Sequence, residues 1–77
     1  MDYDKNFKDI CKKLGLHIYK IRCEKQFSLK EISEKTGIRT EYLRKIESGT
    51  AYGVLIERHL LKIAKVLNIK MSELFDI

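Results

Sequence analysis

The stretch "SLKEISEKTGIRTEYLRKIESG", residues 28–49, decides the fold of this chain. Ser28 followed three residues later by Glu31 forms a capping box, which predicts that a helix begins immediately after the serine. Gly37 can adopt the left-handed conformation that stops a helix. A second short helical pattern follows and ends at Gly49. The stretch therefore predicts two short helices joined by a tight turn.

The second helix of this pair combines an apolar face with a charged one. When Leu43 is set facing the core, Ile46 lies about 60° away on the same side of the helix. Polar and charged side chains fill an arc of about 100° on the far side: Glu41, Arg44, Lys45 and Ser48. A charged helix face is usually solvated surface, so this face alone assigns no function.

Apolar residues at three- and four-residue steps predict a long first helix over residues 4–25. The stripe consists of Phe7, Ile10, Cys11, Leu14, Ile18 and Ile21. Asp2 or Asp4 can supply its N-cap. Gly15 weakens the helix, and a break there would separate an N-terminal helical extension, residues 1–13, from the core.

The chain after the pair continues the helical pattern. A helix over about 54–67 is predicted from its apolar residues, Leu55, Ile56, Leu60, Ile63, Ala64 and Leu67. A last helical turn is expected at about 72–76. The sequence thus predicts an all-α fold, with five helices around one core of about residues 14–76, in a single domain spanning 1–77.

Composition narrows the class of protein. The chain has 77 residues and a formal net charge of +5, and this excess of lysine and arginine predicts a polyanionic partner. The opening "MDYDKNF" lacks the apolar segment of a signal peptide. No apolar run approaches the roughly 20 residues that span a bilayer. We therefore expect a cytoplasmic protein without a membrane partner.

Cysteine and histidine residues give no sign of a metal site or an enzyme. Cys11, His17 and Cys23 are spaced by six residues, about 600° of helix rotation, so they do not converge on one side. Both cysteines are predicted to be reduced, semi-buried packing residues. His17 and His59 belong to no nucleophile–base arrangement, so we expect no catalysis, cofactor or metal.

Several segments, taken in order, resemble the Cro and phage-repressor type of helix-turn-helix family, also called XRE-like. These are "IYKIR" at 18–22, "SLKEIS" at 28–33, "TGI" at 36–38, "YLRKIESG" at 42–49 and "LLKIAKVLNIKMSELF" at 60–75. The resemblance implies a compact, five-helix repressor-like domain whose second and third helices form the helix-turn-helix. It also implies that the third helix enters the major groove of double-stranded DNA.

The resemblance carries roles for individual residues. Those matching or flanking base-reading positions are Arg39, Thr40, Glu41, Arg44 and Lys45. Those expected at phosphates are Ser28, Leu29, Lys30, Tyr42, Ser48 and Tyr52. Many relatives carry a phosphate-binding glutamine where this chain has Leu29, which leaves backbone N–H groups and Lys30 for that contact. Tyr52 either reaches the DNA backbone or packs.

Two further features follow from the resemblance. Arg22 and Glu47 resemble a partly buried ion pair that joins the first helix to the end of the third, although both are also read as ordinary solvated charges. Arg39 and Lys70 stand where serine or threonine usually caps a helix. The sequence therefore predicts the first residue of each of these two helices only to within about one position.

The function implied is a sequence-specific transcriptional regulator of the repressor or controller type, which binds a palindromic operator as a homodimer. The expected dimer contacts are the C-terminal apolar residues Met71, Leu74, Phe75 and Ile77. An alternative surface is the N-terminal one, through Tyr3, Phe7 or Ile10. The chain ends after the fifth helix, so no small-molecule ligand is expected. The alternative function is an antitoxin-like or other protein-interaction module.

Overall fold

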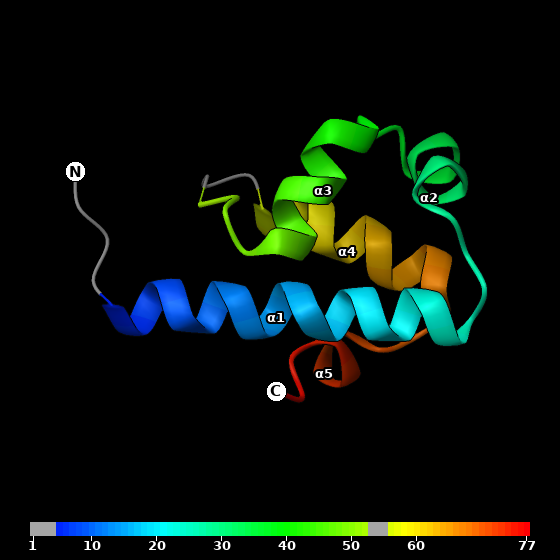
Figure 1. Cartoon of the computed structure of the whole chain (residues 1–77). Coiled ribbons are helices and arrows are strands. Elements are labelled where there is room, and N and C mark those ends of the chain that lie inside the picture. The colour runs from blue at the N-terminus through cyan, green and yellow to red at the C-terminus, as the bar shows by residue number, and fades with distance from the viewer. Residues whose placement is uncertain (1–4, 53–55) are drawn as a thin grey trace.

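The computed structural model describes residues 5–52 and 56–77, and over these ranges it contains helices and no strands (Figure 1). The helices are α1 (Lys5–Glu24), α2 (Leu29–Thr36), α3 (Thr40–Ser48), α4 (Ile56–Leu67) and α5 (Met71–Leu74). This order confirms the predicted all-α, five-helix architecture. None of the described helices is long and apolar enough to cross a bilayer.

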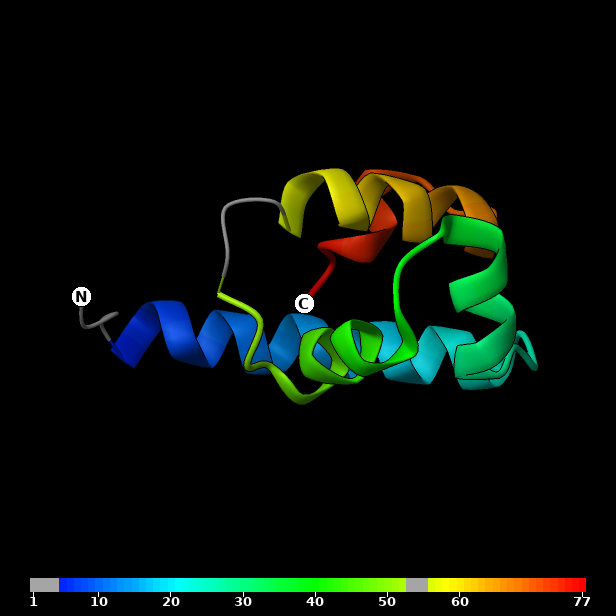
Figure 2. The same cartoon turned by 90° about the horizontal axis from the view of Figure 1, so that it is seen from above.

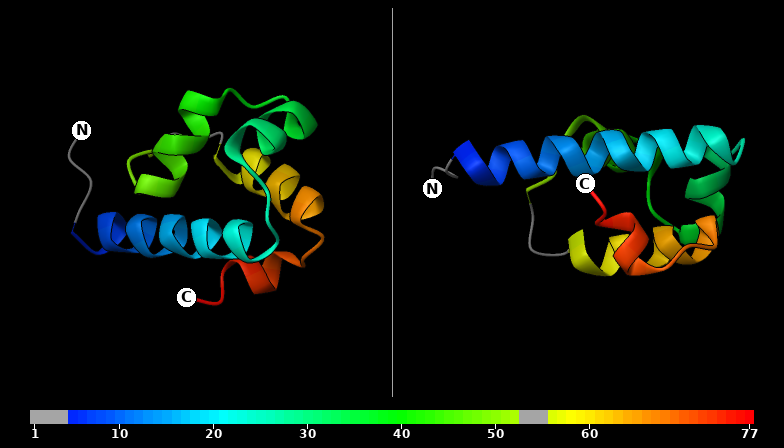
Figure 3. Two further views of the ribbon diagram at one scale, coloured as in Figure 1. Left: turned by 45° about the vertical axis from the view of Figure 1, so that its right-hand side comes forward. Right: turned by 90° about the horizontal axis from the view of Figure 1, so that it is seen from below.

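Helix α1 runs through Gly15 without the break that this glycine made possible. The expected N-cap residues, Asp2 and Asp4, lie outside the described residues. The prediction of one continuous core-facing stripe on α1 was wrong at the N-terminal end of the helix, because Phe7 and Ile10 are 38% and 51% exposed. The reason is that the first turns of α1 project past the other helices, so the core does not reach them (Figure 3).

The turn between α2 and α3 forms as its local chemistry predicts. Ser28 Oγ accepts from the Glu31 N–H at 3.0 Å, and the Glu31 carboxylate accepts from the Ser28 N–H at 3.0 Å. Gly37 ends α2 at a φ of +77°, and its N–H donates to Ser33 O at 2.9 Å. Gly49 ends α3 in the same left-handed conformation.

Two helix starts lacked a clear sequence signal, and the structure now locates them. Arg39 is the N-cap of α3, so Thr40 is its first residue, and no side chain caps this end. Helix α5 begins at Met71, one residue earlier than predicted from Ser72. The Lys70 N–H at this start donates to the Glu73 carboxylate at 3.4 Å, which is a weak substitute for a serine or threonine cap.

The core lies between α1, α3 and α4 and is closed by α2 and α5. Its buried residues are Leu14, Ile18, Ile32, Ile38, Leu43, Ile46, Ala51, Leu60, Ile63, Ala64, Leu67 and Leu74. Viewed from above, α4 lies on one side of the molecule, while α1 and α3 lie along the other (Figure 2). The N-terminus of α2 opens on this second side. The arrangement therefore leaves one side of α3 uncovered by other helices.

Candidate nucleic-acid interface

The outer face of α3 is the most prominent charged surface beside the turn. Arg39, Glu41, Arg44 and Lys45 are exposed, and Thr40 is half-buried. Leu43 and Ile46, on the opposite face, are each only 2% exposed. The helix is therefore oriented as the sequence predicted, with its apolar face in the core and its charged face in solvent.

The N-terminus of α2 has backbone N–H groups that make no hydrogen bond within the helix. The first intrahelical hydrogen bond runs from Ile32 N–H to Ser28 O at 3.1 Å, and the Glu31 N–H is taken by the cap. The N–H groups of Leu29 and Lys30 precede that bond, as the first donors of any helix do. The Lys30 side chain is exposed, while Leu29 packs against the core. An anion at this end would meet two amides and a lysine.

Three residues expected at phosphates have contacts within the chain. The Tyr42 ring meets the His59 ring edge-on, with centroids 4.9 Å apart. Ser48 Oγ donates to Lys45 O at 3.0 Å. The Tyr52 ring packs on Phe7 with centroids 6.0 Å apart, which is the packing alternative for this tyrosine. Phosphate contacts by these three residues remain predictions.

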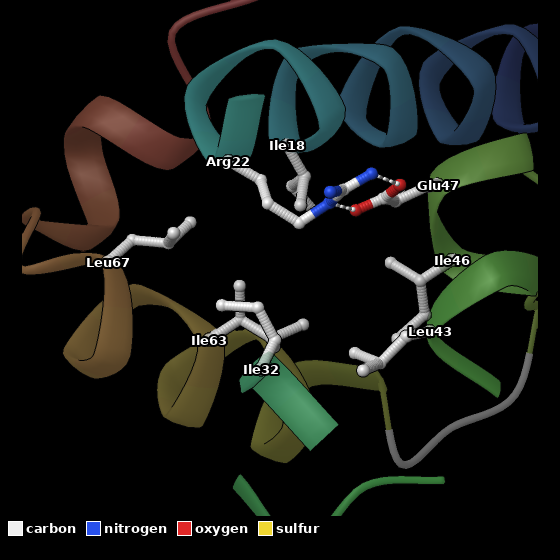
Figure 4. Close-up of a pocket in the computed structure, with 8 residues that line it drawn as sticks. All are labelled: Ile18, Arg22, Ile32, Leu43, Ile46, Glu47, Ile63 and Leu67. Carbon is white, nitrogen blue, oxygen red and sulfur yellow. Dashed lines mark hydrogen bonds and ion pairs between the residues drawn. The ribbon is translucent and has the colours of Figure 1, made fainter. Parts of the chain in front are cut away.

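The expected ion pair between α1 and α3 is present (Figure 4). Arg22 Nε lies 2.7 Å from Glu47 Oε2, and Arg22 Nη2 lies 3.1 Å from Glu47 Oε1. A third guanidinium nitrogen donates to Phe27 O at 2.9 Å. Both side chains are only 12% exposed, and the hydrogen bonds with Glu47 raise the pKa of Arg22. The two-bond geometry fixes the end of α3 against α1, and the reading as ordinary solvated charges is wrong.

Two glycines bring α1 and α3 into close contact, a role that sequence reasoning missed. A Cβ on Gly15 would lie 2.6 Å from the Glu47 carbonyl oxygen, and a Cβ on Gly49 would lie 2.6 Å from the Lys12 Cα. Real Cβ atoms do not approach other atoms this closely, so both positions require glycine. The only signal in the sequence was Gly15 itself, a residue that weakens the middle of a long helix unless a close contact requires it. Together with the ion pair, these contacts hold α3 at one angle.

His59 is a further residue that the sequence interpretation did not place at this site. Its ring packs on Tyr42, and its buried Nδ1 atom has no hydrogen-bond partner among residues 5–52 and 56–77. Burial lowers the pKa of His59, and the positive charges of Lys62 and Arg58 lower it further. The neutral imidazole is therefore the favoured form in the folded chain. His59 supports the N-terminal half of α3 from below, through Tyr42.

The cysteines and His17 do not come together. Cys11 is buried, and burial raises the pKa of its thiol. Cys23 is exposed, so the prediction that both cysteines are semi-buried was wrong for this one. His17 Nε2 lies 2.9 Å from Glu73 O and ties α1 to α5. This contact gives His17 a structural role between α1 and α5.

The C-terminal surface expected to form a dimer needs one correction. Leu74 is completely buried inside its own chain, so its side chain cannot contact a second copy. Helix α5 turns this residue into the core because α4 and α1 cover it. Phe75 and Ile77 are 46% and 49% exposed, and Met71 is half-buried. On the alternative N-terminal surface Phe7 and Ile10 are exposed, and Tyr3 lies outside the described residues.

Comparison with known proteins identifies relatives of this arrangement. A family model described as helix-turn-helix matches residues 18–74 and leaves out residues 5–17 of α1. The crystal structure of the restriction-modification controller protein C.AhdI from Aeromonas hydrophila is similar, with a TM-score of 0.73 and 27% sequence identity. The likeness covers 86% of this chain and 96% of that chain. A search of curated proteins gave no match.

Proposed function

The chain belongs to the helix-turn-helix family, of the Cro and phage-repressor type, and on that premise we propose that it is a sequence-specific regulator of transcription. In this proposal it binds a two-fold symmetric operator as a homodimer in the cytoplasm. Each copy inserts α3 into a major groove, and dimers place two such helices about 34 Å apart along the duplex.

The observation that carries the proposal is the uncovered outer face of α3. Glu41, Arg44 and Lys45 are exposed on a helix whose opposite face is locked into the core. Arginine or lysine at these positions can donate to guanine O6 and N7, and the glutamate can accept from cytosine N4. Within the described residues, these three side chains make no hydrogen bond or ion pair, so they are available to contact base edges.

In this proposal, groups at the edges of the outer face of α3 also contact phosphates of the DNA backbone. The amides of Leu29 and Lys30, with the Lys30 ammonium, suit a phosphate oxygen at the N-terminus of α2. Arg39 and Thr40 lie at the start of α3, where a helix in the groove first meets the duplex. Phosphate contacts set the register of the protein, and the α3 side chains then select the sequence.

The similarity to a restriction-modification controller supports the controller type of regulator for this chain. For the dimer, we favour the C-terminal surface formed by Met71, Phe75 and Ile77, because two of its three apolar side chains are about half exposed. Exposed apolar side chains that lie together are typical of an interface between proteins.

The alternative function, a protein-interaction module of the antitoxin-like kind, has one observation in its favour. Leu61 on α4 is 45% exposed and is not part of the C-terminal surface, whereas Leu16 on α1, 50% exposed, lines a hollow together with Ile77 of that surface. Apolar side chains of this kind suit a protein partner other than a second copy. Single exposed leucines are common on protein surfaces, however, so the DNA-binding function is the stronger proposal.

One experiment tests the proposal. The full chain is used to select binders from random DNA duplexes, and the mass of the resulting complex is measured. We expect an enriched palindrome that carries two protein copies, with an affinity that falls steeply as salt rises. A chain that enriches no sequence, and is released from duplex DNA equally at all salt concentrations, would rule the proposal out.

A further inference from the structure

The first half of α1 carries a cationic face that base reading by α3 does not use. Between residues 5 and 14 the helix holds four lysines and one acidic residue, Asp9. Lys5, Lys8 and Lys12 are exposed. At about 100° per residue, these three fall within an arc of about 60°. Within the described residues none of them has an ion-pair partner.

This cationic face is fixed beside the C-terminal end of α3. The backbone of Lys12 lies so close to Gly49 that a Cβ there would come within 2.6 Å of the lysine Cα. Nearer the N-terminus of α1, the Phe7 ring packs on Tyr52, which follows α3 in the chain. The lysines thus continue the α3 surface past its last residue, Ser48, and are held there by two separate contacts.

The lysines of α1 lie well around that helix from a buried leucine, as Lys45 does on α3. On α1, Lys8 and Lys12 lie about 120–160° around the helix from Leu14, which is buried in the core. On α3, Lys45 lies about 160° from the buried Leu43. In the view from above, α1 and α3 run along the same side of the molecule, and α4 lies on the other (Figure 2).

We propose that Lys5, Lys8 and Lys12 form a second phosphate-binding surface, which contacts the DNA backbone beyond the groove that receives α3. This inference rests on the proposed function, because it requires a duplex docked on α3. A lysine ammonium is a point charge that suits a phosphate oxygen and carries no information about base identity. The surface therefore adds affinity and salt dependence while sequence preference stays with α3.

The test compares two pairs of substitutions in the full chain that remove equal charge. The first pair is Lys8→Gln with Lys12→Gln, in which glutamine keeps the part of the side chain that packs on Gly49. The control pair is Lys62→Gln with Lys65→Gln, two exposed residues that lie about 140–160° around α4 from the buried Leu60. Affinity for the selected operator and for a scrambled duplex is measured over a series of salt concentrations. Thermal unfolding checks that each variant is folded.

We expect the first pair to reduce the slope of log affinity against log salt by about 1.8, or about 0.9 for each lost phosphate contact. Affinity at about 0.1 M salt should fall roughly tenfold or more for both duplexes, so the ratio between them is kept. The control pair should change neither quantity by more than a small fraction of this. If the first pair unfolds, Lys8→Gln alone repeats the comparison with half the expected change in slope.

The outcomes separate this inference from the proposed function. A parent chain that binds no duplex refutes the proposed function, and the inference with it. A parent chain that binds its operator, with both pairs of variants behaving alike, refutes the second phosphate surface and leaves base reading by α3 intact. A variant that loses the operator but keeps the scrambled duplex would show that these lysines select sequence, which also contradicts the inference.

Discussion

Gly15 in the middle of α1 lies directly under the end of α3, where a Cβ would come within 2.6 Å of the Glu47 carbonyl oxygen. The atom in the way is backbone, which cannot swing aside as a side chain can. Helix propensity by itself favours alanine over glycine by about 1 kcal/mol at such a position. Local preference and tertiary fit thus oppose each other here, and the fit requires glycine.

Gly15→Ala should therefore destabilise the protein, although it improves the local helix. Forcing an extra methyl group into a packed contact costs about 1–3 kcal/mol, so we expect the melting temperature to fall by roughly 10 °C. Gly37→Asn is the matched control, because asparagine tolerates the left-handed conformation and no atom lies within 4 Å of that site. Equal melting temperatures for Gly15→Ala and the parent would contradict the close crossing of α1 and α3.

Breaking the ion pair between α1 and α3 should cost more than an ordinary surface pair. Glu47→Ala leaves the Arg22 guanidinium only 12% exposed and without its carboxylate, so we expect a loss of about 2–3 kcal/mol in the free energy of unfolding. Replacing both residues together, as Arg22→Met with Glu47→Leu, should restore most of that loss. Denaturant unfolding of the single and double variants measures both terms. Single variants within about 0.5 kcal/mol of the parent would indicate a pair without net effect.

The capping box of α2 gives a prediction that depends on pH. Ser28→Ala should lower stability by about 1 kcal/mol at neutral pH, because Ser28 Oγ satisfies the Glu31 N–H. The Ser28 N–H and hydroxyl lower the pKa of Glu31. A carboxylate with a lowered folded pKa adds stability above its unfolded pKa, and that stability is lost as pH falls through the folded value. Urea unfolding should therefore show a smaller gap between parent and variant at acid pH. A gap that widens there would contradict the assignment.

Local chemistry made the turn between α2 and α3 predictable. A serine and a glutamate three residues apart form their hydrogen bonds within one helical turn, and Gly37 needs only its own backbone freedom to end α2. None of these features depends on distant parts of the chain. The pair of Arg22 and Glu47, by contrast, followed from resemblance to a family, since nothing local relates residues 25 positions apart.

Several of the features that sequence missed depend on where the core ends. The periodicity of α1 does not distinguish the buried Leu14 from the exposed Ile10, because both lie on one stripe and only the partners of the helix differ. Leu74 and Phe75 are equally apolar neighbours, yet α5 places the first in the core and the second in solvent. Apolar residue type indicates that burial is favourable, but not whether the chain or a partner provides it.

Protonation of His59 should lower the free energy of unfolding at mildly acid pH. Its pKa is lowered by burial and by the charges of Lys62 and Arg58, while on the α3 side it faces the Tyr42 ring and lies near Arg39. As pH falls, His59 in the unfolded chain binds a proton at about pH 6.5, which is a higher pH than in the folded chain. Stability is therefore full above that pH and falls as pH drops through the folded value. His59→Phe keeps the ring contact and should remove this part of the pH dependence in thermal unfolding. A parent and variant with parallel pH profiles would count against a neutral, half-buried imidazole.

Two substitutions on the proposed DNA-binding side separate base reading from phosphate binding. Arg44 is exposed on the outer face of α3, so Arg44→Ala should weaken binding to the selected operator by about 1–3 kcal/mol and relax the choice of one base pair. Lys30→Ala, at the N-terminus of α2, should weaken binding to all duplexes about equally and reduce the salt slope by about 1. Titration of both variants with operator and scrambled duplexes distinguishes these effects. Arg44 sits on a helix held at one angle by Gly15, Gly49 and the ion pair of α1, so its loss should leave the fold and the remaining contacts in place. If both variants bound the operator as tightly as the parent, α3 would not be the element that enters the groove, and a protein partner would become the better reading of this surface.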